Sequence, residues 1–532
     1  MSSSVASLTV DPHDETGKSR LTYSAVIRSL VERLTQRSSY LRGEPRLQND
    51  SSSSSSLTSR QHPIAEFNRS EIKLGTLLGQ GSFSNVYEVI GIQLEHQFDI
   101  LDKEPRVDNE GSSTYISHFD MLSPIQRQRI RLASQMEGAG HGKFMYAMKC
   151  LKPELLEADN PKTFLDAATD LVVEAKYLSK LDHNNILKLR GLAKGWEGAF
   201  EDGHYDSFFI LVDRLEENLH ERIKRWKQGE LLNENTLECK LSIALQVASA
   251  MAYLADRNLL FRDLKPQNIG LIRSSSRDTL LTVKLFDFGF CRELPTLDQP
   301  QDVVTEAEIL KTPTMKAREA TFLMSGKGTR RYMAPEVLRF NCYNLKCDVY
   351  SFAMNLYELL TLQKPFYQYS REQHSLFVVE GGDRPPLDAS SYVTTLWSGA
   401  SSYGLSLSLS SIGSTASFKG GDESIDFEQC MTNPLRDLLR QAWHQDLSQR
   451  PSMEQVNQQL QAIKASLDDD DDIRDIPETT EGCLSSILGV QQSCLGGEIR
   501  DALVELASDI RDLPFSACFG RDIYPHSSIF HP

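Results

Sequence analysis

Two short polar segments constrain this chain more than any other feature of its sequence. The first, Arg262-Asp-Leu-Lys-Pro-Gln-Asn268, follows the apolar residues Leu259-Leu-Phe261. The second, Asp287-Phe-Gly289, follows Val283-Lys-Leu-Phe286. Both segments contain carboxylate or amide side chains, whose oxygens are hard ligands of the kind that Mg²⁺ prefers. A fold that uses them together has to place both segments at one site.

In this order, the two segments resemble the catalytic loop and the metal-binding loop of eukaryotic protein kinases. The resemblance is specific because two independent motifs agree, whereas a lone Asp-Phe-Gly would occur by chance in many proteins. It implies an α+β, bilobal fold, with a five-stranded antiparallel sheet and one main helix in the small lobe. A larger helical lobe would lie below, with ATP bound between the lobes.

The resemblance implies a catalytic or metal-binding role for four residues of these segments. Asp263 would orient and deprotonate the hydroxyl of the substrate, and Lys265 would lie against the γ-phosphate of ATP. Asn268 and Asp287 would bind Mg²⁺ together with phosphate oxygens and water. Phosphoryl transfer asks a protein mainly for positioning and charge neutralisation, which these residue types supply.

The resemblance also implies nucleotide-binding residues in a turn between two strands, on a third strand and on a helix that follows it. A glycine-rich turn between two predicted strands would bind ATP phosphates through its backbone, and Val86 would cover adenine. On the strand 144–151, Ala147 would admit adenine and Lys149 would reach the α- and β-phosphates. Glu174, on a helix that begins at Pro161, would pair with Lys149. The turn consists of Leu78, Gly79, Gln80, Gly81, Ser82, Phe83, Ser84, Asn85 and Val86.

Backbone groups of Asp213 and Leu215, in a hinge after the apolar strand 208–212, would bind the edge of adenine. The sequence departs from the family pattern at three residues of the implied site. Ser84 replaces the third glycine of the turn, and Phe261 replaces a histidine whose role is largely packing. Gly270 stands where a leucine commonly lies under adenine, and its neighbours Ile269 and Leu271 could replace that leucine.

The segment from residue 287 to 336 would be a long activation segment. Thr329 would hydrogen-bond Asp263 and Lys265, an arrangement typical of serine/threonine kinases. Arg262 indicates control by phosphorylation, with Ser325 as the candidate acceptor of an upstream kinase. The alternative is that Ser325 is only a loop serine.

The resemblance extends to residues that would support the catalytic loop and to stretches that indicate a subgroup of the family. Asp348 would cap backbone amides of that loop, and Glu336 would form a buried ion pair with Arg450. The stretches 348–352 and 381–386, together with Trp443, are most similar to the tyrosine-kinase-like group, whose members act mostly on serine and threonine.

The net charge and the cysteine pattern limit which classes of binding partner and which cellular compartment we expect. A formal net charge of -16 argues against a nucleic-acid surface. The nine cysteines show no paired spacing, which indicates reduced thiols in the cytoplasm or nucleus. No membrane span or secretory signal is expected. The basic stretch 18–42 has apolar residues at helical spacing, which predicts a short docking helix more than an organelle-targeting helix.

The expected domain organisation is a kinase domain between two tails. Residues 1–65, with the serine run Ser51–Ser56, would be a disordered tail, and residues 465–532 an acidic, mostly disordered tail. The kinase domain would span 66–464, with insertions at about 91–142 and 387–427. The first insertion would contain a helix from Ser123-Pro124 to near Gly138. The second contains an alternating stretch that indicates a phosphorylatable loop or an added strand.

The sequence therefore predicts an ATP- and Mg-dependent protein serine/threonine kinase. A catalytically weak scaffold that keeps the fold is the alternative, and Ser84, Phe261 and Gly270 are its support. A tyrosine or small-molecule kinase is disfavoured by Thr329 and Lys265.

Overall fold

The computed structural model describes residues 64–94, 122–138, 145–157, 161–195, 208–273, 281–294, 326, 328–388 and 431–472. It also describes ten positions between residues 28 and 42. Ser325, most of the activation segment, most of the insertion 387–427 and the predicted C-terminal tail beyond residue 472 lie outside these ranges.

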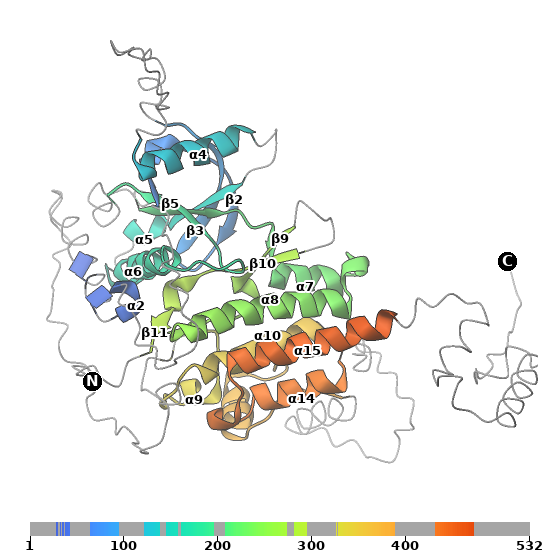
Figure 1. Cartoon of the computed structure of the whole chain (residues 1–532). Helices are drawn as coiled ribbons and strands as arrows, with labels where there is room; N and C mark the ends of the chain where they lie inside the picture. The colour runs from blue at the N-terminus through green and yellow to red at the C-terminus, as the bar shows by residue number, and fades with distance from the viewer. Residues whose placement is uncertain are drawn as a thin grey trace, which may run out of the picture. The chain divides into compact units, whose positions relative to one another are not determined.

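A six-stranded sheet forms the small lobe, in the order β1-β5-β6-β4-β3-β2 (Figure 1). The prediction of five antiparallel strands was wrong by one strand, because β1 adds to the edge in parallel with β5. Ala65 and Phe67 of β1 are fully buried, and this burial explains why so short a strand joins the sheet. The strands are β1 Ala65–Phe67, β2 Ile72–Gln80, β3 Ser84–Ile92, β4 Tyr146–Leu151, β5 Leu189–Ala193 and β6 Phe209–Asp213.

The insertion between β3 and β4 leaves these two strands as hydrogen-bonded neighbours. Its helix α4, Pro124–Gly138, begins where the sequence predicts, with Ser123 and Gln126 forming reciprocal bonds of 2.9 and 3.2 Å. The helix packs on β1 and β3, and Arg129 forms an ion pair with the buried Glu71. The insertion therefore extends the lobe without disturbing the sheet.

Helix α6, Pro161–Leu178, lies between the sheet and the helical lobe (Figure 1). Its apolar stripe is buried, which fits the helical spacing in the sequence. The stripe consists of Phe164, Ala168, Leu171, Val172, Ala175 and Leu178.

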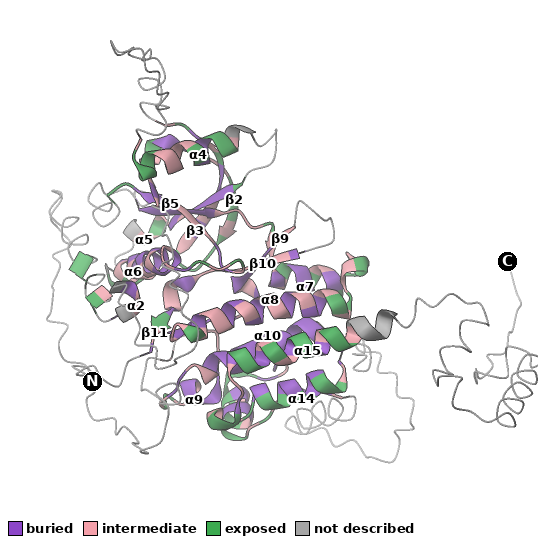
Figure 2. Ribbon diagram, in the orientation of Figure 1, coloured by how far each residue is buried: buried purple, intermediate pink, exposed green. Residues whose placement is uncertain are grey.

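The helical lobe is packed around two apolar helices, α8 and α10, whose inner faces are buried (Figure 2). Thr236 caps α8 by accepting a hydrogen bond of 3.1 Å from the backbone amide of Cys239. Within the described part of the chain, α8 alone has the length and hydropathy of a membrane span, yet it packs as a core helix against α10 and strand β10, Leu281–Leu285. The helices are α7 Leu219–Lys227, α8 Leu237–Asp256, α9 Pro335–Leu338, α10 Lys346–Thr361, α14 Asn433–Ala442 and α15 Met453–Asp472.

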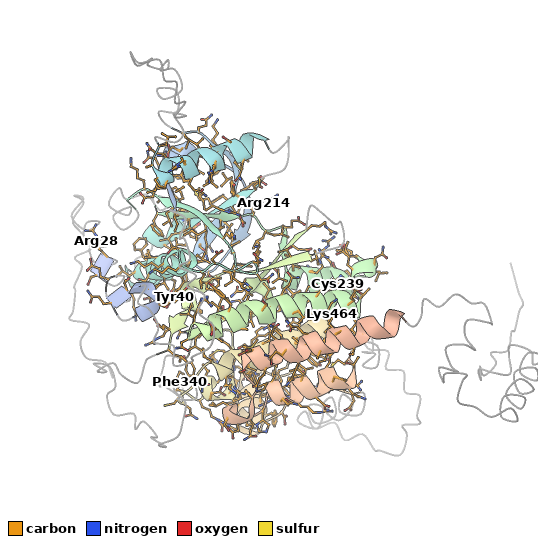
Figure 3. All side chains as sticks on the ribbon, in the orientation of Figure 1. Arg28, Tyr40, Arg214, Cys239, Phe340 and Lys464 are labelled. Atoms are coloured by element: carbon orange, nitrogen blue, oxygen red, sulfur yellow. The ribbon has the colours of Figure 1, made fainter. Side chains whose placement is uncertain are left out.

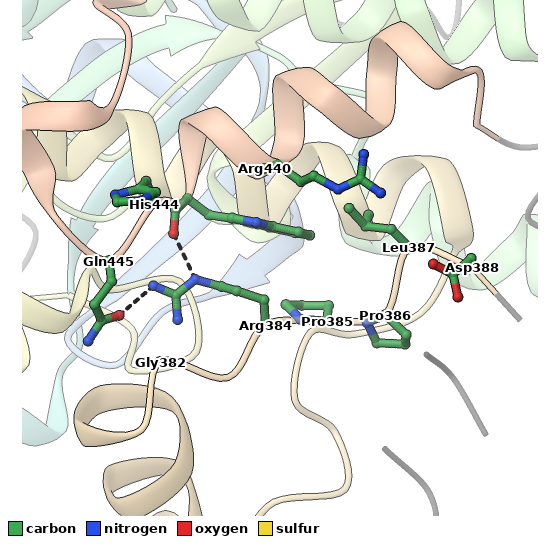
Figure 4. Close-up of a pocket in the computed structure, with 10 residues that line it drawn as sticks. Gly382, Arg384, Pro385, Pro386, Leu387, Asp388, Arg440, His444 and Gln445 are labelled. Atoms are coloured by element: carbon green, nitrogen blue, oxygen red, sulfur yellow. Dashed lines mark hydrogen bonds between the residues drawn. The ribbon is translucent and has the colours of Figure 1, made fainter. Parts of the chain in front are cut away.

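Two motifs that lie far apart in the sequence form contacts within the helical lobe. Arg450 donates hydrogen bonds of 2.7 and 2.8 Å to Glu336, and both residues are buried, which confirms the predicted ion pair. Arg384 donates to the carbonyl of Trp443 at 2.7 Å and to Gln445 at 2.6 Å, beside a cavity of about 460 Å³ (Figure 4). The segment 381–386 thus has a structural role away from the implied site.

Candidate active site

Short strand pairs bring the two polar segments together. The first segment lies between β8, Leu259–Leu260, and β9, Ile269–Arg273. The second lies between β10, Leu281–Leu285, and β11, Arg292–Glu293. Because β9 pairs with β10 and β8 pairs with β11, the two connecting loops are side by side. A bond of 3.1 Å from the amide of Phe286 to the carbonyl of Asn268 joins them directly.

Asp263 lies at the centre of a hydrogen-bonded cluster and is 5% exposed. Its two carboxylate oxygens accept bonds of 2.8 Å from the Thr329 hydroxyl and 2.6 Å from the Lys265 ammonium. Lys265 also contacts the Thr329 hydroxyl at 3.2 Å. The amide of Asn268 donates to the backbone carbonyl of Asp263 at 2.9 Å and to its carboxylate at 3.1 Å. The carboxylate is thereby fixed in one orientation beside a cation and two polar side chains.

Asp348 holds the start of this loop from within helix α10. Its carboxylate accepts bonds of 2.7 Å from the amide of Phe261 and 3.0 Å from the amide of Arg262. Arg262 has a φ of 67°, a left-handed conformation that a non-glycine residue keeps only when its surroundings impose it. Burial raises the pKa of Asp348 to about 6, although the two amide bonds oppose that rise. The carboxylate thus imposes the backbone conformation next to Asp263.

Sequence reasoning missed a second support of the loop, Asn355. Its amide donates 2.9 Å to the carbonyl of Leu264, and its side chain is buried among the apolar residues of α10. The available signal was an asparagine inside an otherwise apolar helix, since a buried amide of this kind needs a hydrogen-bond partner.

Lys149 joins three elements in one cluster, in which Glu174 is buried and Asp287 is partly exposed. Its ammonium lies 2.6 Å from Glu174 of α6 and 3.1 Å from Asp287. Burial alone would lower the pKa of Lys149, but Asp287 and Glu174 raise it well above its ordinary value. Lys149 in turn holds the pKa of Asp287 below its usual range, whereas burial raises the pKa of Glu174. Lys149 and Asp287 therefore stay charged at neutral pH.

Phe261 occupies the position where the family pattern has histidine. Its ring meets the ring of Phe288 edge to face, with centroids 5.0 Å apart, and both rings are fully buried. Such a pair is a favourable aromatic geometry. The replacement therefore preserves the packing under the second segment.

The glycine-rich turn joins β2 to β3, where Gln80 pairs with Asn85. Its tip is fixed by a bond of 2.8 Å from the amide of Gly81 to the carbonyl of Ser84. Phe83 at the tip is exposed, and its carbonyl accepts a bond of 3.0 Å from the amide of Lys152. Val86 pairs with Lys149, so the turn lies directly beside the lysine-bearing strand.

The hinge after β6 contains Asp213 and Leu215, and Leu215 fills a space beside Gly270 that the prediction gave to other residues. Asp213 forms a two-pronged pair with Arg190, with distances of 2.6 and 3.1 Å, which ties the end of β6 to β5. A Cβ atom on Gly270 would lie 2.5 Å from the side chain of Leu215, so Leu215 occupies the space that a larger residue would need. The space was assigned to Ile269 and Leu271 from the sequence, because chain neighbours were considered and a residue from the hinge was not.

These groups suit Mg²⁺ and ATP. Asp287 is 44% exposed on its side chain although Lys149 binds it, so its carboxylate is accessible. The side chain of Asn268 donates through its nitrogen, which leaves the amide oxygen as its ligand atom. A carboxylate and an amide oxygen are hard donors for Mg²⁺, and Lys149 with the glycine-rich turn suits anionic phosphates.

A second cavity, of about 520 Å³, lies next to Thr329. Its wall combines apolar side chains with the cationic Arg330, Arg331 and Arg371. The apolar part of the wall comes from Met333, Val337, Leu338, Phe340 and Tyr369.

Comparisons with known proteins agree with this geometry. Residues 138–460 match the family model of the protein kinase domain. The chain is 29% identical over 277 residues to a putative mitogen-activated protein kinase kinase kinase 7-like protein of Drosophila melanogaster, covering 51% of this chain and 59% of that protein. It is 28% identical over 301 residues to the serine/threonine-protein kinase VIK of Arabidopsis thaliana, covering 56% of this chain and 51% of that protein. The chain thus spans little more than half the length of these relatives.

Proposed function

This chain belongs to the protein kinase family, and we propose that it transfers the γ-phosphate of ATP to serine and threonine hydroxyls of protein substrates. One observation carries the proposal. Asp263, Lys265 and Thr329 form a closed triangle of bonds, 2.6 to 3.2 Å long, next to the ion pairs of Lys149. This arrangement of charged groups supports a role in phosphoryl transfer.

In the proposed reaction, Asp263 orients the substrate hydroxyl and accepts its proton. Lys265, held against the same carboxylate, supplies positive charge where the transferring phosphate meets the hydroxyl. Lys149, fixed by Glu174, anchors the other phosphates of ATP. Asn268 and Asp287 would hold Mg²⁺, which neutralises charge on the phosphate oxygens.

Two features support a protein substrate with a serine or threonine acceptor. Thr329 bonds the catalytic carboxylate and Lys265, as the family resemblance implies for serine/threonine kinases. The cavity beside Thr329 can receive a neighbouring side chain of a polypeptide.

The test uses the full chain with Mg-ATP and a peptide library that contains serine, threonine or tyrosine. We expect Asp263→Asn to reduce transfer at least about a thousandfold, because it removes the proton acceptor, while ATP binding is retained. The matched control is Asp256→Asn at the exposed end of α8, which should leave transfer unchanged. Wild-type protein that binds ATP but transfers nothing to any peptide would favour the scaffold alternative.

We also propose that the protein works in the cytoplasm or nucleus. The described cysteines, Cys150, Cys239, Cys291, Cys342 and Cys347, are free thiols, which suits a reducing compartment. A fluorescent fusion of the full chain tests this, and accumulation in an organelle lumen would contradict it.

A further inference from the structure

A short N-terminal segment lies against the end of helix α6. We call the described residues between 35 and 42, which include helix α2 (Ser39–Arg42), the N-terminal clasp. Tyr40 lies next to the end of α6 (Figure 3), and its hydroxyl donates 3.1 Å to the carbonyl of Lys180. Its ring stacks on Tyr177 with centroids 6.5 Å apart, and the Lys180 ammonium donates to the carbonyl of Leu41. The contacts come from the C-terminal end of the stretch 18–42, whereas the apolar residues on which the docking-helix prediction rests lie outside the described residues.

The clasp also binds the chain directly after the second polar segment. Ser38 donates 2.5 Å to the carboxylate of Glu293, which lies in β11. The backbone amide of Tyr40 donates 3.1 Å to the same carboxylate. Ser38 and Leu41 are buried, at 5% and 6% exposure, although they precede the first strand of the sheet. One carboxylate thus anchors two residues of the clasp.

These two anchor points lie close in the chain to residues of the candidate active site. Tyr177 lies three residues after Glu174 on α6, and so on the next turn of the same helix. Glu293 follows Asp287-Phe288-Gly289, and β11 pairs with β8 just before the catalytic loop. The Tyr177 hydroxyl also receives a hydrogen bond from the backbone of Glu293. The clasp therefore covers a junction between α6 and β11 and bonds to both.

Docking of this segment favours one arrangement of the site. The bonds of the clasp form only when the end of α6 lies beside β11, which is the arrangement in which Lys149 meets both Glu174 and Asp287. A segment that binds one arrangement and not another shifts the population toward the one it binds. Because the clasp belongs to the same chain, its effective concentration is high.

We propose that the junction of α6 and β11 is a binding site for the chain's own residues 35–42, and that their docking activates the enzyme. This inference rests on the proposed kinase function. It predicts that charge placed against Glu293 releases the clasp, since a second carboxylate there would be repelled.

The first experiment measures transfer by full-length variants. We expect two variants each to lower kcat/KM about tenfold. Tyr40→Ala removes the hydrogen bond to the carbonyl of Lys180 and the ring contact with Tyr177. Ser38→Asp replaces the hydrogen bond to the Glu293 carboxylate with repulsion between two carboxylates. Ser38→Asp combined with Glu293→Gln should recover most of the loss, because the repulsion is removed. Gln36→Ala, an exposed position of the same segment, is the control and should behave as wild type.

The second experiment does not depend on catalysis. Hydrogen exchange should be faster in the last two turns of α6 and at residues 291–294 in Tyr40→Ala, also in an Asp263→Asn background. Unchanged exchange shows that the clasp does not dock, and faster exchange with unchanged kcat/KM shows that docking does not activate. Either result overturns the proposal. If exchange is faster in Tyr40→Ala than in wild type, but the wild-type protein transfers no phosphate, the proposed function is rejected and the docking site is kept.

Discussion

Replacing Asp348 with asparagine should separate activity from stability. The carboxylate accepts two amide bonds, of 2.7 and 3.0 Å, and one of the donors is the strained Arg262. An asparagine side chain has one acceptor oxygen, so one amide loses its partner at a cost of about 1–3 kcal/mol. The strained backbone beside Asp263 is then no longer held.

The same substitution removes a buried charge. The pKa of Asp348 is about 6, compared with about 3.9 for an unfolded aspartate. Below about pH 4 both states hold the proton, and the stabilising contribution of Asp348 is fully present. As the pH rises toward 6, only the unfolded state has lost its proton, so this contribution falls by about 1.4 kcal/mol per pH unit. At pH 7 the lost charge and the lost bond offset each other to within about 2 kcal/mol.

We therefore expect Asp348→Asn to lower kcat about ten- to a hundredfold, since about 1–3 kcal/mol of positioning is lost. The KM for ATP should stay the same, because Lys149 and the glycine-rich turn are untouched. The assays are steady-state kinetics and urea unfolding between pH 5 and 7, with the exposed Asp437→Asn as control. The reasoning is refuted if kcat is unchanged, or if the stability difference between wild type and variant does not vary with pH.

Three more substitutions test individual contacts. Glu336→Gln should lower the free energy of unfolding by about 3–5 kcal/mol, because it leaves the Arg450 cation buried and unpaired; urea unfolding measures this, and a loss below about 1 kcal/mol would contradict it. Gly270→Ala should lower the free energy of unfolding by about 1–3 kcal/mol, because the added Cβ overpacks against Leu215. Adding Leu215→Ala to the same chain should restore most of this loss. If unfolding experiments show that the effects of the two substitutions simply add, the prediction is wrong. Phe261→His should keep kcat within about threefold, since an aromatic ring still meets Phe288; a large gain or loss in the peptide assay would assign this position a role beyond packing.

Much of the site was predictable because it consists of local motifs. The resemblance to protein kinases implied the pairing of Lys149 with Glu174, on a strand and a helix that are adjacent in sequence, and the structure brings both to Asp287. The start of α4 was predictable for the same reason, since its cap involves only Ser123 and Gln126. In each case the informative residues lie within one or two elements.

The features that were missed depend on contacts between distant segments. Leu215 fills the space beside Gly270 although 55 positions separate them, and β1 pairs with a strand more than a hundred residues away. Asn355 supports Leu264 across 91 positions. No local pattern of hydrophobicity or turn residues reports such contacts, because their energy comes from packing that only the complete fold creates.

The adjacency of β3 and β4 across the long insertion has a practical consequence. The chain leaves the sheet after Ile92 and returns at Tyr146, yet the two strands bond along their whole shared length. The covalent connection between the two strands therefore contributes little to the stability of the sheet, apart from keeping both strands in one molecule. Two polypeptides divided between residues 95 and 121, each carrying one strand, should therefore reassemble into a working enzyme, and fusing them to an inducible dimeriser would make its activity switchable.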